Sequence, residues 1–273
     1  MLTAITGKTA ILLMLADPVS HIRGSALINS SFKEMNLDAA ISPIHVLPED
    51  VPFCLDAIRR MRNVAGLGIT IPHKIPVYSL VDEVTEAAQR MGAVNFVRRN
   101  SDGTLVGHNI DGEGFIRGLK AHEFAPVGKK VLVVGAGGVG RAIALALTEA
   151  GVSSLSIANR TFAKAEALAR EGAAIAPACN SKAVDLDDPA ALEDIDLLVN
   201  ATSLGMHEGD PLPLAVDGLS AATTVAEVII SPAMTPLLQA AQDRGCITIP
   251  GDAMLKPQPQ LVAQFLGLRP RAE

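Results

Sequence analysis

The sequence predicts an α/β protein in which short apolar strands alternate with helices. Apolar runs of strand length recur along the chain, separated by segments whose apolar residues recur at helical spacing. One of these runs leads directly into a glycine-rich turn that opens a helix. The chain has 273 residues, of which 49% are hydrophobic and 19% charged, enough for two domains with their own cores.

The first part of the chain contains a series of apolar runs with intervening helical patterns. Strands are predicted at residues 10–15, 39–46 and 66–71, and helices at 25–35 and 49–62. Residues 79–87 carry polar and charged side chains at helical spacing, which predicts a further helix. Segments 93–98 and 104–107 predict a hairpin, because the Asp102-Gly103 pair between them favours a tight turn.

The first apolar run has two interpretations. It has the length of the hydrophobic part of an export signal, and Lys8 precedes it. Asp17-Pro18 closes the run with turn residues, which favours a buried parallel strand. No apolar stretch of the sequence is long enough to span a membrane.

The second part of the chain shows a more regular alternation. Strands are predicted at 130–134, 155–158, 197–200 and 225–229, and helices at 138–150 and 162–171. The tail at 256–266 predicts a helix whose first turn accommodates Pro257 and Pro259. The boundary between the two parts is expected near residues 107–111.

Charge and cysteine content exclude several classes of protein. The formal net charge is −6 and no basic run exceeds a pair, so we expect no nucleic-acid partner. The three cysteines lie far apart, as in a cytoplasmic protein with reduced thiols. No cluster has the spacing of metal ligands, so no metal is predicted, and neither is a membrane partner.

The glycine-rich turn has the pattern of a dinucleotide site. The three glycines of a G-x-G-x-x-G pattern give a tight turn, close approach to a pyrophosphate, and close helix–strand packing. The amide groups at the start of the following helix bind the phosphates. The predicted residues are Gly135, Ala136, Gly137, Gly138, Val139 and Gly140.

The end of the next predicted strand indicates which cofactor is used. An NAD enzyme places Asp or Glu there to bind the ribose hydroxyls. This sequence instead has polar and basic residues there, namely Asn159, Arg160, Thr161 and Lys164. Such residues suit the 2′-phosphate of NADP. The alternative is an ordinary helix start with solvated basic residues.

A small polar segment follows the predicted strand at 197–200. A loop at the carboxyl end of such a strand lines the cofactor cleft, and by itself the segment also fits a helix cap. We expect Ala201, Thr202 and Ser203 of this segment to bind the cofactor, together with Val228 after the next strand.

A lysine and an aspartate are the catalytic candidates. Lys74 follows a strand, Asp111 follows the hairpin, and such a pair can hold a hydroxyl and move its proton. A free lysine has a pKa of about 10.4, so a base of this kind requires an environment that lowers it. From spacing alone, Lys74 fits an ordinary exposed surface position better than a catalytic one.

A series of motifs, in this order, resembles the shikimate dehydrogenase family across nearly the whole chain. The matching segments are Thr70-Ile-Pro-His-Lys74, Gly92-Ala-Val-Asn95, Asn109-Ile-Asp111-Gly112, Gly135-Ala-Gly-Gly138, Asn159-Arg160-Thr161, Asn200-Ala-Thr202-Ser203 and Thr235-Pro236-Leu237-Leu238.

The resemblance implies a fold and a set of roles. It implies a three-layer α/β substrate-binding catalytic domain at 1–108 plus 248–273 and a Rossmann-like NADP domain at 109–247. The C-terminal helix then returns to the first domain. Lys74 and Asp111 become the catalytic pair, and Thr70, Asn95 and Gln258 are similar to residues that bind ring hydroxyls.

The chain departs from the family pattern where the substrate carboxylate binds. Two serines of that pattern are absent from the stretch His21-Ile22-Arg23-Gly24-Ser25, so Ile22 and Gly24 occupy the substrate site. Gly68 replaces an Asn, Ile110 replaces a Thr, and Glu227 and Ile230 replace an Asp and a Tyr. Each lost donor to a charged group costs about 1–3 kcal/mol.

Two interpretations of these departures remain open. Ser20, Ser25 or Arg23 supplies replacement donors, or the substrate is a ring alcohol or ketone without a carboxylate in that place. The expected function is reversible hydride transfer between NADP(H) and a cyclic hydroxy acid or ketone, by a monomer or homodimer. The alternatives are a quinate-type or secondary-pathway dehydrogenase and a non-catalytic NADP-binding sensor.

Overall fold

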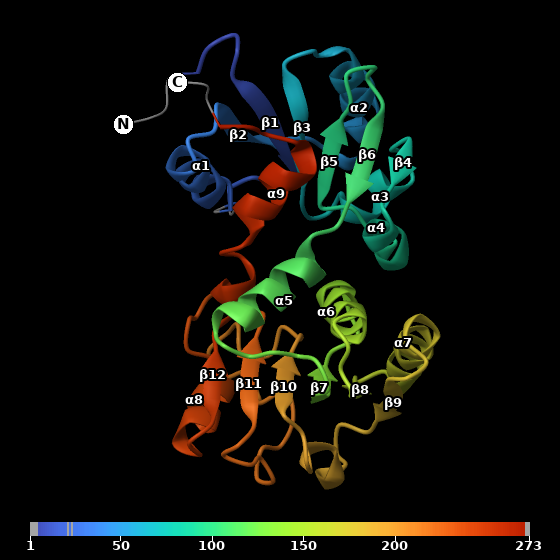
Figure 1. Cartoon of the computed structure of the whole chain (residues 1–273), viewed down its shortest axis with the longest axis vertical. Coiled ribbons are helices and arrows are strands. Elements are labelled where there is room, and N and C mark those ends of the chain that lie inside the picture. The colour runs from blue at the N-terminus through green and yellow to red at the C-terminus, as the bar shows by residue number, and fades with distance from the viewer. Residues whose placement is uncertain (1–4, 21, 23, 271–273) are drawn as a thin grey trace. The chain divides into compact units, whose positions relative to one another are not determined.

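The computed structural model describes residues 5–20, 22 and 24–270. Contacts divide the chain into two compact units, each built around its own sheet (Figure 1). The first unit comprises Met1–Ile110 together with Gln258–Glu273, and the second comprises Asp111–Pro257.

The first unit contains a six-stranded mixed sheet in the order β2-β1-β3-β5-β6-β4. Its central strand β1 pairs in parallel with β2 and β3, so the apolar run that resembled an export signal forms a strand inside this sheet. The hairpin β5–β6 runs antiparallel to β3. The strands are β1 (Ala10–Ala16), β2 (Ala39–His45), β3 (Val64–Ile69), β4 (Glu83–Val84), β5 (Phe96–Arg99) and β6 (Leu105–His108).

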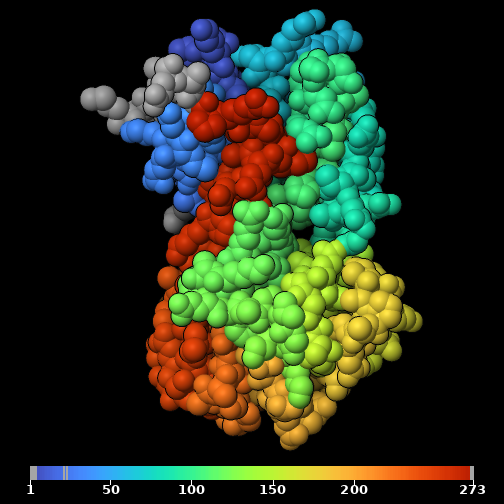
Figure 2. Space-filling model, viewed as in Figure 1, coloured from blue at the N-terminus to red at the C-terminus, as the bar shows by residue number. Residues whose placement is uncertain are grey.

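Helices cover both faces of this sheet, which gives the predicted three layers. One face packs on α1 (Gly24–Glu34) and the C-terminal helix α9 (Gln258–Leu266), which lie side by side (Figure 2). Phe32 of α1 and Val262 of α9 are both fully buried in this layer. The other face packs on α2 (Val51–Arg60), α3 (Lys74–Tyr78) and α4 (Glu86–Met91), and the exposed turn η1 (Pro48–Asp50) leads into α2.

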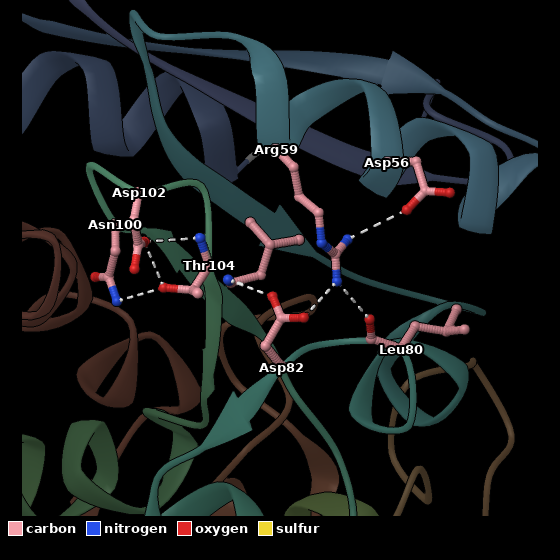
Figure 3. A network of polar contacts seen from close by, with 8 residues as sticks. Asp56, Arg59, Leu80, Asp82, Asn100, Asp102 and Thr104 are labelled. Atoms are coloured by element: carbon pink, nitrogen blue, oxygen red, sulfur yellow. Dashed lines mark hydrogen bonds and ion pairs between the residues drawn. The ribbon is translucent and has the colours of Figure 1, made fainter.

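A polar network joins the hairpin to α2 and to the segment before β4 (Figure 3). The Arg59 guanidinium donates to Asp82 Oδ1 at 3.0 Å and to the Leu80 carbonyl at 3.2 Å. Asp82 also accepts the Leu105 amide at 2.7 Å through Oδ2, and its own amide donates to the Leu105 carbonyl at 3.0 Å. The predicted helix over 79–87 is therefore wrong at 79–85, because pairing with the hairpin holds these residues as a turn and the short strand β4, and only residues 86–87 are helical, as the start of α4.

The second unit contains a fully parallel six-stranded sheet in the order β12-β11-β10-β7-β8-β9. This is the strand order of the doubly wound dinucleotide-binding folds. From β7 the chain adds β8 and β9 on one side and then β10, β11 and β12 on the other, so the direction in which strands are added reverses beside β7. The strands are β7 (Lys130–Val134), β8 (Ser154–Ala158), β9 (Asn180–Val184), β10 (Leu197–Asn200), β11 (Thr224–Glu227) and β12 (Ile247–Ile249).

Helices also cover both faces of the second sheet. One face carries α5 (Asp111–Ala121), α6 (Gly138–Glu149) and α7 (Phe162–Ile175), and the other carries η2 (Pro189–Leu192) and α8 (Pro236–Asp243). The segment η3 (Gly251–Met254) packs on α5, where a side chain added at Gly118 would meet the Ala253 carbonyl at 2.7 Å. This contact explains why the second unit extends to residue 257, beyond the predicted limit of 247.

No described helix combines the length and apolar character that crossing a bilayer requires.

Candidate cofactor and active site

The glycine-rich turn lies between β7 and α6, as the sequence predicts. Gly135 has a φ of 110°, a conformation that other residues rarely adopt. A side chain at Gly140 would overlap the Gly135 carbonyl, so close packing of helix on turn requires glycine there. Gly137 and Gly138 have no atoms within 4 Å of an added Cβ, and the N-cap Gly137 has no side-chain cap. The amides at the start of α6 are thus open to an anion.

Asn159 joins the glycine turn to the basic segment after β8. Its Oδ1 accepts the Ala136 amide at 3.0 Å, and its Nδ2 donates to the Thr161 carbonyl at 2.9 Å. An amide at this position therefore fixes both loops without adding negative charge. Arg160 and Lys164 are exposed and have room to bind an anionic group.

These segments line a cleft of about 370 Å³ at the carboxyl ends of β7, β8 and β10. Ten predicted residues line it: Gly135, Ala136, Gly137, Asn159, Arg160, Thr161, Lys164, Ala201, Thr202 and Ser203. Four predicted residues are not in its lining, namely Gly138, Val139, Gly140 and Val228. The prediction missed Val134, Leu186, Leu204 and Pro213.

Leu186 was missed because β9 was not recognised in the sequence. This edge strand is mostly polar and only Val184 in it is buried, so it lacks an apolar run. Its existence follows from topology, since a doubly wound sheet needs a third strand after α7.

The loop after β10 forms no helix and is fixed by the side chain of Asn200. The Oδ1 atom of Asn200 accepts the Thr202 amide at 3.0 Å and the Thr202 hydroxyl at 2.7 Å. Its Nδ2 donates to the Leu204 carbonyl at 3.1 Å. A side chain at Gly135 would come within 2.8 Å of the Ala201 backbone, so this loop also packs tightly on the glycine turn.

In the first unit, backbone hydrogen bonds bring three predicted residues to one edge of the sheet. Thr70 follows β3, and Lys74 is the first residue of α3. The Ile69 amide donates to the Asn95 carbonyl at 2.8 Å, and the Val94 amide donates to the Lys74 carbonyl at 2.9 Å. Thr70 and Lys74 are half-buried, and Asn95 is buried.

Asn95 also holds the chain directly before Asp111. Its Oδ1 accepts the Ile110 amide at 3.0 Å, and Asp111 begins α5 as a buried residue. Lys74 and Asp111 belong to different compact units, so their pairing stays a prediction.

The remaining predicted substrate residues lie at the ends of α1 and α9. Gly24 is the exposed first residue of α1, and Gln258 is the half-buried first residue of α9. Ile22 packs against the apolar cluster that includes Met14 and Ile41. Arg23, one of the predicted replacement donors, and His21 lie outside the described residues.

The position of Gly68 is also surrounded by apolar groups. A Cβ added there would lie 2.9 Å from Met14 Cε and 3.4 Å from Ile41 Cδ1. The Met14 side chain therefore fills the space that a larger residue at position 68 would need.

Among the residues that the structure describes, no three His, Cys, Asp or Glu side chains are grouped so as to hold a metal ion. The three cysteines are unpaired.

Family models match both parts of the chain. Residues 14–97 match the shikimate dehydrogenase substrate binding domain, and residues 119–206 match the shikimate / quinate 5-dehydrogenase model.

Individual proteins match over nearly the full length. The chain is 38% identical to shikimate dehydrogenase (NADP(+)) of Geobacter metallireducens, covering 97% of this chain and 94% of that protein. A 5-ketofructose reductase of Gluconobacter, solved without ligand, superposes with a TM-score of 0.87 at 30% identity, covering 96% and 94% of the two chains. Shikimate 5-dehydrogenase from Thermus thermophilus in complex with NADP(H) and shikimate gives a TM-score of 0.84 at 32% identity, covering 96% and 95%. The chain therefore belongs to the shikimate dehydrogenase family.

Proposed function

We propose that the protein is an NADP-dependent oxidoreductase that catalyses reversible hydride transfer with a cyclic hydroxy acid or ketone. The observation that carries the cofactor assignment is the composition of the cleft beside β8. Its described lining includes Arg160 and Lys164 and no Asp or Glu. Such a lining favours the 2′-phosphate of NADP, which a carboxylate would repel. The Geobacter and Thermus relatives, named for NADP(+) and solved with NADP(H), support the same choice.

The residues of the glycine turn fit the pyrophosphate of this cofactor. Gly137 and Gly138 leave open space, and the N-terminus of α6 presents amides without a competing side chain. When bound, NADP supplies the carbon that accepts or donates the hydride.

Lys74 and Asp111 would move the proton in this reaction. In the oxidation direction the neutral Lys74 amine accepts the proton of the substrate hydroxyl, and in reduction the ammonium returns it. Asp111 would hold the reacting hydroxyl in line with that amine. Thr70, Asn95 and Gln258 would bind the other hydroxyls of the ring.

The test is steady-state oxidation of shikimate and of quinate by the purified protein, with NADP and with NAD. Efficient turnover of shikimate with NADP is the expected result if Ser25, Ser20 or Arg23 replaces the two missing serines. Turnover of quinate with NAD alone would overturn the cofactor assignment and favour a quinate-type enzyme.

A second candidate is a dehydrogenase for a substrate without a carboxylate. The observation in its favour is that Met14 and Ile41 lie beside Gly68, and that Ile22 packs against the apolar cluster to which both belong. The similarity to a 5-ketofructose reductase supports it, since the sugar in that name carries no carboxylate. Comparing shikimate with its decarboxylated analogue, and with 5-ketofructose, decides between the two. Equal or greater activity on the uncharged compounds supports the second candidate, and strong dependence on the carboxylate excludes it.

Two further expectations remain predictions. The unpaired cysteines are consistent with the predicted cytoplasmic location. The chain is predicted to act as a monomer or homodimer.

A further inference from the structure

A buried carboxylate lies at the carboxyl end of the second sheet, behind the loop that lines the cofactor cleft. Glu227 is the last residue of β11 and is only 1% exposed. Its register partner on β10 is the fully buried Asn200. In the described part of the chain, Glu227 is held by amide and hydroxyl donors, and no ion pair with Lys or Arg is found. A charge buried in this way is costly, so its presence needs a reason.

Both oxygens of Glu227 accept hydrogen bonds. Oε1 accepts from Asn200 Nδ2 and from the Thr235 hydroxyl, each at 2.9 Å. Oε2 accepts the Val228 amide at 3.2 Å and the Ile229 amide at 3.4 Å. All four partners are donors, and only the ionised carboxyl group accepts without donating. The carboxylate satisfies all four donors at once, whereas an amide at this position would set its NH₂ group against another donor, such as Asn200 Nδ2. A neutral acid keeps the network only by donating to the Thr235 hydroxyl oxygen.

The hydrogen bond to Asn200 carries this constraint to the cofactor cleft. Asn200 Oδ1 accepts twice from Thr202, and Nδ2 donates to Leu204. Rotation of the amide by half a turn would set its NH₂ group against the Thr202 amide and its oxygen against two acceptors, Glu227 Oε1 and the Leu204 carbonyl. Glu227 thus adds a hydrogen bond that favours the orientation of Asn200 in which its side chain fixes residues 201–204, which line the cleft.

The remaining hydrogen bonds of Glu227 hold the loop after β11. Thr235 also caps α8 by accepting the Leu238 amide at 3.2 Å. A second cleft, of about 580 Å³, is lined by Gly205 and Met206 from one loop and by Ser231, Pro232 and Thr235 from the other. One side chain consequently ties the loop after β10, whose residues line both clefts, to the loop after β11, which lines the second cleft.

Burial raises the pKa of Glu227, against the opposing effect of its hydrogen bonds to Asn200 and Thr235. A raised pKa means that the ionised group lowers the stability of the fold as the pH rises through that pKa. A residue that costs stability while it orders two loops is typical of a functional position.

We propose that Glu227 is a positioning residue, whose carboxylate holds the loop after β10 in the conformation that binds the cofactor. The inference rests on the proposed NADP site. It assigns Glu227 no contact with cofactor or substrate.

The test compares Glu227→Gln with Glu227→Asp in the full-length protein. The first variant keeps the size and removes the acceptor-only group, while the second keeps the charge and removes a methylene. The dissociation constant for NADPH, from fluorescence titration, should rise roughly tenfold in the Gln variant, since hydrogen bonds to charged groups are worth about that factor or more. The Asp variant should bind NADPH more tightly than the Gln variant, and kcat at saturating NADP should change less than KM for NADP.

Asp196→Asn is the matched control. Asp196 accepts the Lys130 amide at 2.8 Å at the amino ends of β7 and β10, away from the carboxyl ends where Glu227 lies, and it does not line the cofactor cleft. This variant should leave the NADPH dissociation constant unchanged.

The outcomes separate the inference from the proposed function. If the unchanged protein fails to bind NADPH, the cofactor assignment falls and the inference falls with it. If the unchanged protein binds NADPH and the Gln variant binds it equally well, or better than the Asp variant, only the inference is overturned. Should the Gln variant fail to fold by circular dichroism, the Asp variant decides: weaker NADPH binding supports the role, and unchanged binding overturns it.

Discussion

His73, the residue before Lys74, is fully buried at the start of α3. Its Nε2 lies 2.9 Å from the Val46 carbonyl and donates to it in the corresponding tautomer. Its Nδ1 has no hydrogen-bond partner among the described residues. This hydrogen bond ties the start of α3 to the end of β2, and so it fixes the backbone that carries Lys74. The histidine beside the proposed base therefore has a structural contact of its own, away from the solvent.

Replacement of Lys74 tests the proposed proton transfer. Lys74→Ala should lower kcat by about 10²–10⁴-fold, the usual contribution of a positioned acid or base. NADPH binding should stay unchanged, because the cofactor residues lie in the second unit. Turnover and an NADPH titration measure the two effects. A non-catalytic sensor would show no turnover before the substitution, and if turnover and binding both persist or both vanish, the role assigned to Lys74 is wrong.

Replacement of Arg160 tests the cofactor preference. Arg160→Gln should raise KM for NADP by about 10- to 100-fold, since a charge-assisted hydrogen bond contributes about 1.5–3 kcal/mol. KM for NAD should change little, because NAD lacks the 2′-phosphate. Arg170 is exposed on α7 and does not line the cleft, so Arg170→Gln is the control. Equal changes in the two KM values would contradict the assignment.

At the scale of elements, the hairpin β5–β6 is held by a carboxylate outside it. Asp82 accepts the amide of Leu105 at the start of β6 and pairs with Arg59 of α2 (Figure 3). The hydrogen bond from Leu105 is the largest of the effects that lower the pKa of Asp82. The ionised group therefore contributes stability above its unfolded pKa of about 3.9, and that contribution is lost as the pH falls through the lower folded pKa.

Asp82→Asn should reduce the free energy of unfolding at neutral pH by about 1 kcal/mol or less, because the side chain is partly exposed. The difference from the unchanged protein should shrink as the pH falls from about 5 towards 2. Urea unfolding at a series of pH values measures both effects. Asp56→Asn is the control, since Asp56 lies 3.6 Å from Arg59 and is largely exposed. A difference that grows on acidification would refute this account.

Several elements escaped prediction for reasons that the packing explains. Helix α5 contains three glycines, which weaken any helical prediction. Two of them permit close contacts: a side chain at Gly112 would meet the Ala142 carbonyl of α6 at 2.8 Å, and Gly118 faces Ala253. The polar strand β9 was missed because only one of its residues is buried. The strands with continuous apolar runs, β7 and β10, were predicted with their observed limits.

At the scale of the whole molecule, the C-terminal helix completes the core of the first unit. Leu261, Val262 and Leu266 of α9 are buried in the cluster that also contains Leu12 and Phe32. The second unit has two separate clusters of its own, neither of which uses α9. The stability of the first unit thus depends on residues that follow the second unit in the sequence.

Leu261→Ala should therefore destabilise the first unit by about 2–5 kcal/mol and leave the NADPH affinity of the second unit intact. Guanidinium unfolding and an NADPH titration below the unfolding transition measure the two effects. The exposed Gln260 on the same helix provides the control Gln260→Ala. A parallel loss of NADPH binding would show that the second unit depends on α9.

The sequence by itself determined the features that depend on neighbouring residues. The glycine turn, the basic segment after β8, and the segment from the end of β3 to the start of α3 that carries Thr70 and Lys74 are set by backbone conformation and short-range spacing. Only the tertiary structure decided which segments, far apart in the sequence, pack against one another in the interior. It surrounded Glu227 with four donors, filled the space at Gly68 with Met14, and held residues 79–87 against the hairpin. The physical reason is that burial and the satisfaction of buried polar groups depend on partners far apart in the chain, which local periodicity does not encode.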